Sequence, residues 1–179
     1  MVSACLMGVN CRYDGRHSAC RELLDLAGSL FLVPFCPEQL GGLPTPRPAA
    51  NITGGDGSDI AAGRGRIVNL EGLDVTGAFL RGAQESVRLA ELYGVRVCIM
   101  KDKSPSCGFR TPYCETVSGF GIGVTASVFR SRRIRMVEVG RKDPFPGGRI
   151  LRALKESGYG VEALAGLMKD AGYHGGALS

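Results

Sequence analysis

Three short apolar runs, each leading to a cysteine, constrain what this chain can fold into. Cys5 follows the run MVSA, Cys36 follows FLVPF, and Cys107 follows VRVCIM after a short polar loop. Apolar runs of this length are typical of buried β-strands. The loops that leave the carboxyl ends of parallel strands converge on one crevice. The pattern therefore predicts that three thiols distant in the sequence meet at one edge of a sheet.

Helical patterns alternate with these strands. Apolar residues recur at helical spacing over 18–26, from Asp74 as far as Tyr93, and around 124–128, and a further strand is expected over 134–139. Strands that alternate with helices predict a mostly parallel sheet. We therefore expect an α/β fold, a Rossmann-like sheet with helices on both faces.

Two local patterns add detail to this expectation. Pro34 cannot donate a backbone hydrogen bond, so the second strand is expected at a sheet edge, or to end near Pro34. In the helix after Asp74, Arg81 and Glu85 stand four residues apart and are expected to form an ion pair. The other side of that helix carries the apolar residues Phe79, Ala83, Val87 and Ala90.

Residues 37–72 are rich in glycine and proline and show no clear periodicity. A compact domain seldom holds so long an irregular segment without a functional use for it. We therefore predict that this segment is an active-site loop.

Residues 140–179 form the last part of the chain, and their pattern predicts two short helices, around 150–155 and 161–169. A chain of 179 residues with 44% hydrophobic content can bury one substantial core. We interpret residues 1–139 as one domain and residues 140–179 as a short helical C-terminal extension. The apolar stripe of its second helix could pack on the domain or on a second copy in a homodimer.

The cellular compartment follows from two negative observations. No run approaches the roughly 20 apolar residues of a membrane span, and the first ten residues lack the basic and apolar parts of a secretory signal. Seven cysteines, an odd number, fit a reducing compartment better than a disulfide framework. We therefore expect a cytoplasmic protein without a membrane partner.

The cysteines suggest a metal site built from separate loops. No two are spaced as in zinc ribbons or bacterial ferredoxins. Three thiolates around a metal centre would leave one coordination position open for catalysis. Cys98 lies within a strand pattern and is interpreted as a core residue, and Cys20 as packing at a helix start. The role of Cys11 stays open.

Polar residues near these cysteines are candidates for binding and catalysis. Glu38 lies two residues beyond Cys36, where a carboxylate could deprotonate a water. The segment KDKSPSCG adds candidate ligand-binding groups, namely Lys101, Lys103, Ser104 and Ser106. Arg47 could bind a phosphate together with these lysines, with solvent exposure as the alternative. Asp14 is expected to stabilise a turn.

The motifs of residues 1–139 resemble a bacterial and archaeal family of thiouracil desulfidases, domain of unknown function 523. The resemblance rests on VSACLMGVNCRYDG, CPEQLGGLPTPRP, GDG, DVT, KSPSCG and GVTA, in this order. It implies a [4Fe–4S] cluster with three cysteine ligands and one iron open to the sulfur of a thiolated pyrimidine. The implied ligands are Cys5, Cys36 and Cys107, with Cys11 in reserve.

The same resemblance implies catalytic residues and a substrate. Glu38 matches the acid/base of the family and Ser104 its substrate-positioning hydroxyl. The implied reaction is non-redox desulfidation of a thiopyrimidine base or nucleotide. Independently of the resemblance, the residues themselves make Ser106, Lys101 and Arg47 candidate substrate-binding groups.

Two other functions remain open from the residues alone. The cysteines could exchange persulfide in a sulfur-carrier protein that needs no iron. A cluster of basic residues in the last third could bind RNA or a thiolated tRNA; it consists of Arg130, Arg132, Arg133, Arg135, Arg141, Lys142, Arg149 and Arg152.

Overall fold

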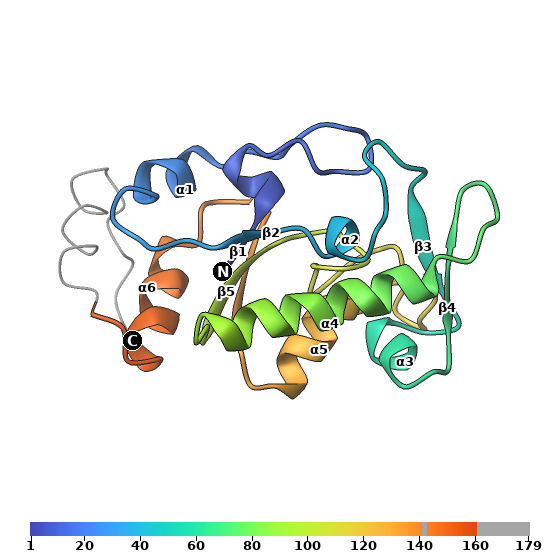
Figure 1. Cartoon of the computed structure of the whole chain (residues 1–179). Helices are drawn as coiled ribbons and strands as arrows, with labels where there is room; N and C mark the ends of the chain where they lie inside the picture. Colours follow the sequence, from blue (N-terminus) through green and yellow to red (C-terminus); the bar gives the residue numbers. More distant parts are fainter. Residues whose placement is uncertain (141–142, 161–179) are drawn as a thin grey trace.

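A computed structural model describes residues 1–140 and 143–160 of the chain. Its centre is a four-stranded sheet in the order β2-β1-β5-β6, in which every pair of neighbouring strands is parallel (Figure 1). The strands are β1 (Val2–Ser3), β2 (Pro34–Phe35), β5 (Val97–Lys101) and β6 (Arg135–Val139). The expected parallel α/β sheet is confirmed, and β2, which begins at Pro34, lies at its edge.

Helices cover both faces of this sheet. The longest central strand, β5, shows why: Cys98 and Met100 face one apolar cluster while Ile99, between them, faces another. The first cluster is completed by α4 (Thr76–Leu92) and α5 (Val124–Ser131), and the second by α1 (Arg21–Leu26) and α6 (Gly147–Glu156). Cys98 is fully buried, as expected of a core residue.

The predicted apolar face of α4 is confirmed, since Phe79, Ala83, Val87 and Ala90 are all buried. The predicted pair between Arg81 and Glu85 is wrong. Arg81 instead donates to the carbonyl of Gly41 at 3.1 Å, and Glu85 pairs with Arg88. A carbonyl of a neighbouring segment lies within reach of Arg81, and tertiary packing therefore decides its partner.

The prediction that residues 37–72 form an irregular loop is wrong. This segment holds two short helices and an antiparallel pair of strands: α2 (Pro37–Leu40), β3 (Ala50–Thr53), α3 (Gly57–Ala61) and β4 (Arg66–Asn69). Ile52 and Ile67 pair across the strands and are fully buried. Elements of four or five residues are too short for periodicity to identify, and their burial depends on contacts with α4 and α5.

Helix α2 is held against α4 by a close approach of two backbones. A Cβ on Gly82 would lie 1.9 Å from the carbonyl oxygen of Pro37, and one on Gly41 would lie 2.0 Å from that of Ala78. Only glycine allows this contact, because any side chain would occupy the space of a backbone atom. The two glycines therefore determine where α2 begins, and with it the position of Cys36 and Glu38.

Helix α6 lies in the segment that was predicted to be an extension, and it packs on the sheet. Ile150 is fully buried with Ile99 and Val137, and Leu154 packs beside them. The first helix expected in the extension is therefore present, and the second, over 161–169, lies outside the described residues. Among the residues that the structure describes, no helix is long and apolar enough to cross a membrane.

Candidate active site

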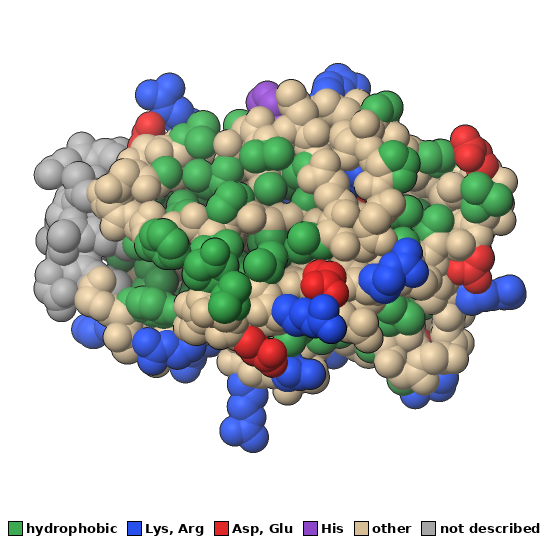
Figure 2. All heavy atoms as spheres, viewed as in Figure 1, with side chains coloured by type: hydrophobic (Ala, Val, Ile, Leu, Met, Phe, Trp, Pro, Cys, Tyr) green, Lys and Arg blue, Asp and Glu red, His purple; other side chains and the backbone are tan. Residues whose placement is uncertain are grey.

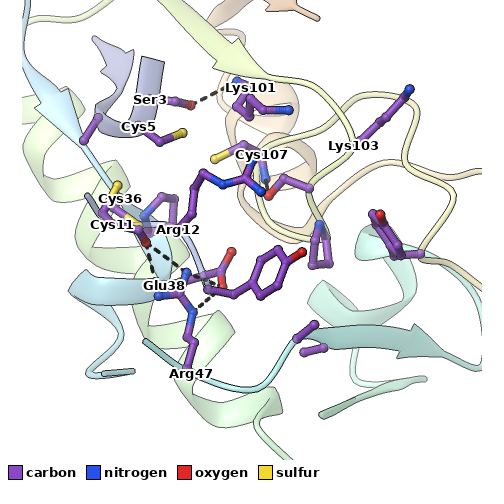
Figure 3. Close-up of a pocket in the computed structure, with 18 of the residues that line it drawn as sticks. Ser3, Cys5, Cys11, Arg12, Cys36, Glu38, Arg47, Lys101, Lys103 and Cys107 are labelled. Carbon is purple, nitrogen blue, oxygen red and sulfur yellow. Dashed lines mark hydrogen bonds and ion pairs between the residues drawn. The ribbon is translucent and has the colours of Figure 1, made fainter. Parts of the chain in front are cut away.

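The carboxyl ends of β1, β2 and β5 open into one cavity of about 360 Å³. Four of the seven cysteines line it, namely Cys5, Cys11, Cys36 and Cys107. In Figure 3 the thiols of Cys5 and Cys107 point into the same space, with Cys11 and Cys36 close together beside them. The predicted meeting of three distant thiols at one sheet edge is confirmed.

The loop after β1 places Cys5 and Cys11. Cys5 lies in a 3-10 helix, η1 (Ala4–Met7), which ends at Gly8 with a φ of 86°, a conformation that favours glycine. The carbonyl of Cys5 accepts a hydrogen bond from the N–H of Ser18 at 2.9 Å. The chain therefore turns back at Gly8, and both cysteines face the cavity.

The loop after β5 places Cys107 through a tight turn. The hydroxyl of Ser104 accepts hydrogen bonds from the N–H groups of Ser106 and Cys107 at 3.2 and 3.1 Å. The N–H of Gly108 donates to the carbonyl of Ser104 at 2.9 Å. A hydroxyl that accepts twice can still donate once, so Ser104, which lines the cavity, can offer its proton to a ligand.

The prediction that Ser106 binds substrate is wrong. Its side chain is 1% exposed and is not among those that line the cavity. Its hydroxyl bonds instead to that of Thr125 on α5 at 2.8 Å. The hydroxyl of Ser106 therefore joins the turn to α5, whereas Ser104 lines the cavity.

Cys11 lies between two of the predicted ligands. Its side chain is buried, its thiol interacts with those of Cys5 and Cys36, and its carbonyl accepts a hydrogen bond from the thiol of Cys36 at 3.7 Å. These interactions stabilise the neighbouring thiolates. They lower the pKa of Cys5, lower the pKa of Cys36 to about 7, and raise the pKa of Cys11 itself.

Cys107 is in a different environment from the other three. Burial raises the pKa of its thiol well above the usual range, because the charged form loses its hydration. Cys107 therefore favours the neutral thiol until a positive centre compensates the charge of its thiolate.

Glu38 faces the cavity from the first turn of α2 and is held by Arg47. The Nε and Nη2 groups of Arg47 both contact Glu38 Oε2 at 2.8 Å. The Arg47 side chain is only 5% exposed. A buried, two-point contact of this kind fixes the direction of the carboxylate.

The alternative that Arg47 is solvent-exposed is wrong, because its side chain is buried, whereas its predicted substrate-binding role stays a prediction. Beyond Glu38, its N–H groups donate to the carbonyls of Cys11 and Pro44 and to the hydroxyl of Thr45. A guanidinium has five N–H groups, and these contacts engage all of them. Arg47 lines the cavity but offers no donor to a ligand.

The two lysines of KDKS differ from each other. Lys101 lines the cavity and is paired with Asp102, and it also donates to the carbonyl of that residue. Lys103 lines the cavity at an exposed position. Asp14 accepts from the N–H of Arg16 and pairs with Arg12, which confirms its predicted turn role.

No pattern in the sequence singles out Tyr113. It lines the cavity and is 43% exposed, with Tyr13, which is 46% exposed, also in the lining. Tyr113 follows the loop of Cys107 in an irregular segment, joined to β3 through the contact of its carbonyl with the N–H of Ile52. This long-range pairing brings it to the cavity.

Four thiols suit an iron–sulfur cluster better than a single ion. Among the described residues, no group of three or more His, Cys, Asp or Glu side chains is placed to hold one metal ion. In a cluster, each thiolate binds a different iron, so the sulfur ligands stand further apart than around a single ion. Cysteine thiolates are the usual ligands of iron–sulfur clusters, and the chemistry of these thiols therefore fits a cluster.

Comparisons with known proteins agree with this chemistry. The chain is 39% identical over 140 residues to the uncharacterized protein YbbK of Bacillus subtilis (strain 168), a match that covers 76% of this chain and 93% of YbbK. The solved structure of the [4Fe-4S]-dependent thiouracil desulfidase TudS matches with a TM-score of 0.68 and 34% identity, over 86% of this chain and 96% of that one. Residues 1–139 match the model of the 2-thiouracil desulfurase family. This chain belongs to the 2-thiouracil desulfurase family.

Proposed function

We propose that this protein removes sulfur from thiolated pyrimidines by hydrolysis, with a [4Fe–4S] cluster bound to Cys5, Cys36 and Cys107. The observation that carries the proposal is that these three thiols and the carboxylate of Glu38 line one cavity. The cavity volume of about 360 Å³ lies within the range of roughly 300–1,000 Å³ that small-molecule sites occupy. Family membership and the structural match to a thiouracil desulfidase support the same reaction.

The three cysteines are suited to their proposed role as ligands. Each leaves a different strand end, so the cluster would link β1, β2 and β5 at the edge of the sheet. When bound, a cluster with three protein ligands supplies an iron that can accept a soft thiocarbonyl sulfur and polarise its bond to carbon. Cys11, whose carbonyl accepts a hydrogen bond from the thiol of Cys36, is assigned a supporting role.

Glu38 is the proposed general base and acid. It takes a proton from the water that attacks the thiocarbonyl carbon, and it returns a proton as sulfur leaves as sulfide. The water supplies the oxygen of the product pyrimidine, and no electron is gained or lost overall. The hydroxyl of Ser104 donates to the pyrimidine and orients it, and the ammonium group of Lys101 lines the same wall.

The substrate is proposed to be a free thiopyrimidine base or its nucleotide. Tyr13 and Tyr113 at the cavity offer aromatic faces to a ring, and Lys103 offers a cation to a phosphate. A thiolated tRNA is less well supported, because the basic cluster is partly compensated. Arg132 pairs with Glu91, and Arg135 with Glu156.

The test is anaerobic reconstitution with iron and sulfide, followed by metal analysis and assays with 4-thiouracil and 4-thio-UMP on one sample. We expect about four irons per chain and release of sulfide from at least one substrate. Glu38→Ala should keep the iron and lose turnover. Full activity in iron-free protein would overturn the proposal, and would favour the persulfide-carrier alternative.

The cytoplasm is the proposed compartment, supported by the free thiols of all seven cysteines. A homodimer is also proposed. Hydrophobic side chains gather on the face shown in Figure 2. Among the described residues, Phe31 is 86% and Leu92 is 75% exposed, and the rings of Phe31 and Tyr93 lie 6.2 Å apart. Exposed apolar patches often mark interfaces. A monomer in light scattering, unchanged by Phe31→Glu, would contradict the dimer.

A further inference from the structure

Arg47 contacts two of the segments that line the cavity, namely helix α2 through Glu38 and the loop after β1 through Cys11. Through Nε and Nη2 it holds the carboxylate of Glu38, and through Nη1 and Nη2 it donates to the carbonyl of Cys11 at 3.2 Å. The thiol of Cys36 donates to this same carbonyl. One buried guanidinium therefore connects the helix of Glu38 to the loop of Cys11 (Figure 3).

The direction of the contact with Glu38 leaves one oxygen available for chemistry. In the part of the chain that the structure describes, both Arg47 contacts go to Oε2. Oε1 therefore remains for a water in the cavity. A base must lie within hydrogen-bond reach of the proton that it takes, and a small error in its placement lowers the rate strongly.

We infer that Arg47 is a positioning residue that fixes Glu38 against the cysteine-lined wall, and that it does not bind substrate. This inference rests on the proposed function, since it assigns Glu38 the role of base. A positioning role for Arg47 and a phosphate-binding role for Arg47 predict different kinetic effects of its substitution. A positioning residue affects the turnover of every substrate, whereas a phosphate ligand affects only the binding of nucleotides.

Arg47→Lys is the decisive variant, because lysine keeps the charge but lacks the planar fork of donors. With reconstituted protein, we expect kcat to fall by about tenfold or more for both 4-thiouracil and 4-thio-UMP, since misplacement of a catalytic group costs up to about a hundredfold. KM should change by less than about threefold, because Arg47 has no donor left for substrate. Iron content should equal that of the unchanged protein.

The matched control is Arg64→Lys. Arg64 pairs with Asp59 at 2.8 Å on the surface and does not line the cavity, so kcat should not change. An unchanged kcat in Arg47→Lys, or a higher KM for 4-thio-UMP alone, would overturn the inference. If the unchanged protein releases no sulfide from either substrate, the proposed function itself fails. This result can be distinguished from the two outcomes that would overturn only the inference about Arg47.

Hydrogen exchange tests the same contact without an assay of activity. In metal-free protein, Arg47→Lys should increase amide exchange over residues 9–13 and 36–41, because the connection between these segments is lost. If Arg47→Lys does not fold, Glu38→Gln is the second variant. This substitution removes the charge of the carboxylate that pairs with Arg47, and it should also increase amide exchange over residues 9–13. Exchange equal to that of the unchanged protein would refute the coupling.

Discussion

At the scale of single residues, the four cysteines of the cavity have different environments and are expected to have different roles. Cys5, Cys36 and Cys107 follow three different strands, while Cys11 interacts with two of them. We expect Cys5→Ala, Cys36→Ala or Cys107→Ala to lose the cluster, because each removes a ligand. Cys11→Ala should retain about four irons. Iron analysis and the visible spectrum decide this, and an iron-free Cys11→Ala protein would make Cys11 a ligand.

The lowered pKa of Cys36 leads to a prediction about how fast its thiol reacts with an alkylating reagent. With a pKa of about 7 in the folded protein, against 9.0 ordinarily, Cys36 is a thiolate at pH 8, and the thiolate is the nucleophile. Iodoacetamide should label it in metal-free protein with a half-maximal rate near pH 7. Burial raises the pKa of Cys114 to about 11, so Cys114 should stay unlabelled. A midpoint near pH 9 for Cys36 would contradict the prediction.

The same shift has a consequence for stability. Because the folded pKa lies below the unfolded one, ionisation of Cys36 stabilises the folded state. This contribution is fully present above pH 9 and is lost as the pH falls through 7.

At the scale of elements, the position of α2 depends on its glycine contact with α4. A methyl group on Gly82 would displace Pro37, and with it Cys36 and Glu38. We expect Gly82→Ala to lower the free energy of unfolding by about 1–3 kcal/mol, as for other overpacked sites, and to reduce turnover. Gly77→Ala is the control, since on the same helix its added methyl would meet only the tip of Arg81, at 3.4 Å. Urea unfolding measures both, and equal stabilities would refute the packing argument.

At the scale of the whole molecule, α6 completes a core that the family match does not include. The match ends at residue 139, yet Ile150 is fully buried against Ile99 and Val137 of the sheet. We expect Ile150→Ala to cost about 2–5 kcal/mol of stability, as other large-to-small core changes do, with kcat unchanged below the unfolding transition. Ala153, at the edge of the same cluster, is a milder site for comparison. An Ile150→Ala protein of unchanged stability would show that α6 contributes little.

Sequence patterns alone were enough to predict the parallel sheet and the convergence of Cys5, Cys36 and Cys107. Both follow from local patterns, because apolar runs specify strands and parallel strands end at one edge. Glu38 and Ser104 were found through motifs next to these cysteines. Both line the cavity with them.

The contacts of Arg47 and Ser106 and the short elements within residues 37–72 could not be predicted, because they depend on packing between distant segments. Whether Arg47 holds Glu38 or a ligand depends on which acceptors lie near its five donors, and those acceptors come from distant segments. Ser106 turned toward Thr125 for the same reason. Periodicity records burial along one element, whereas hydrogen-bond partners are set by contacts between elements.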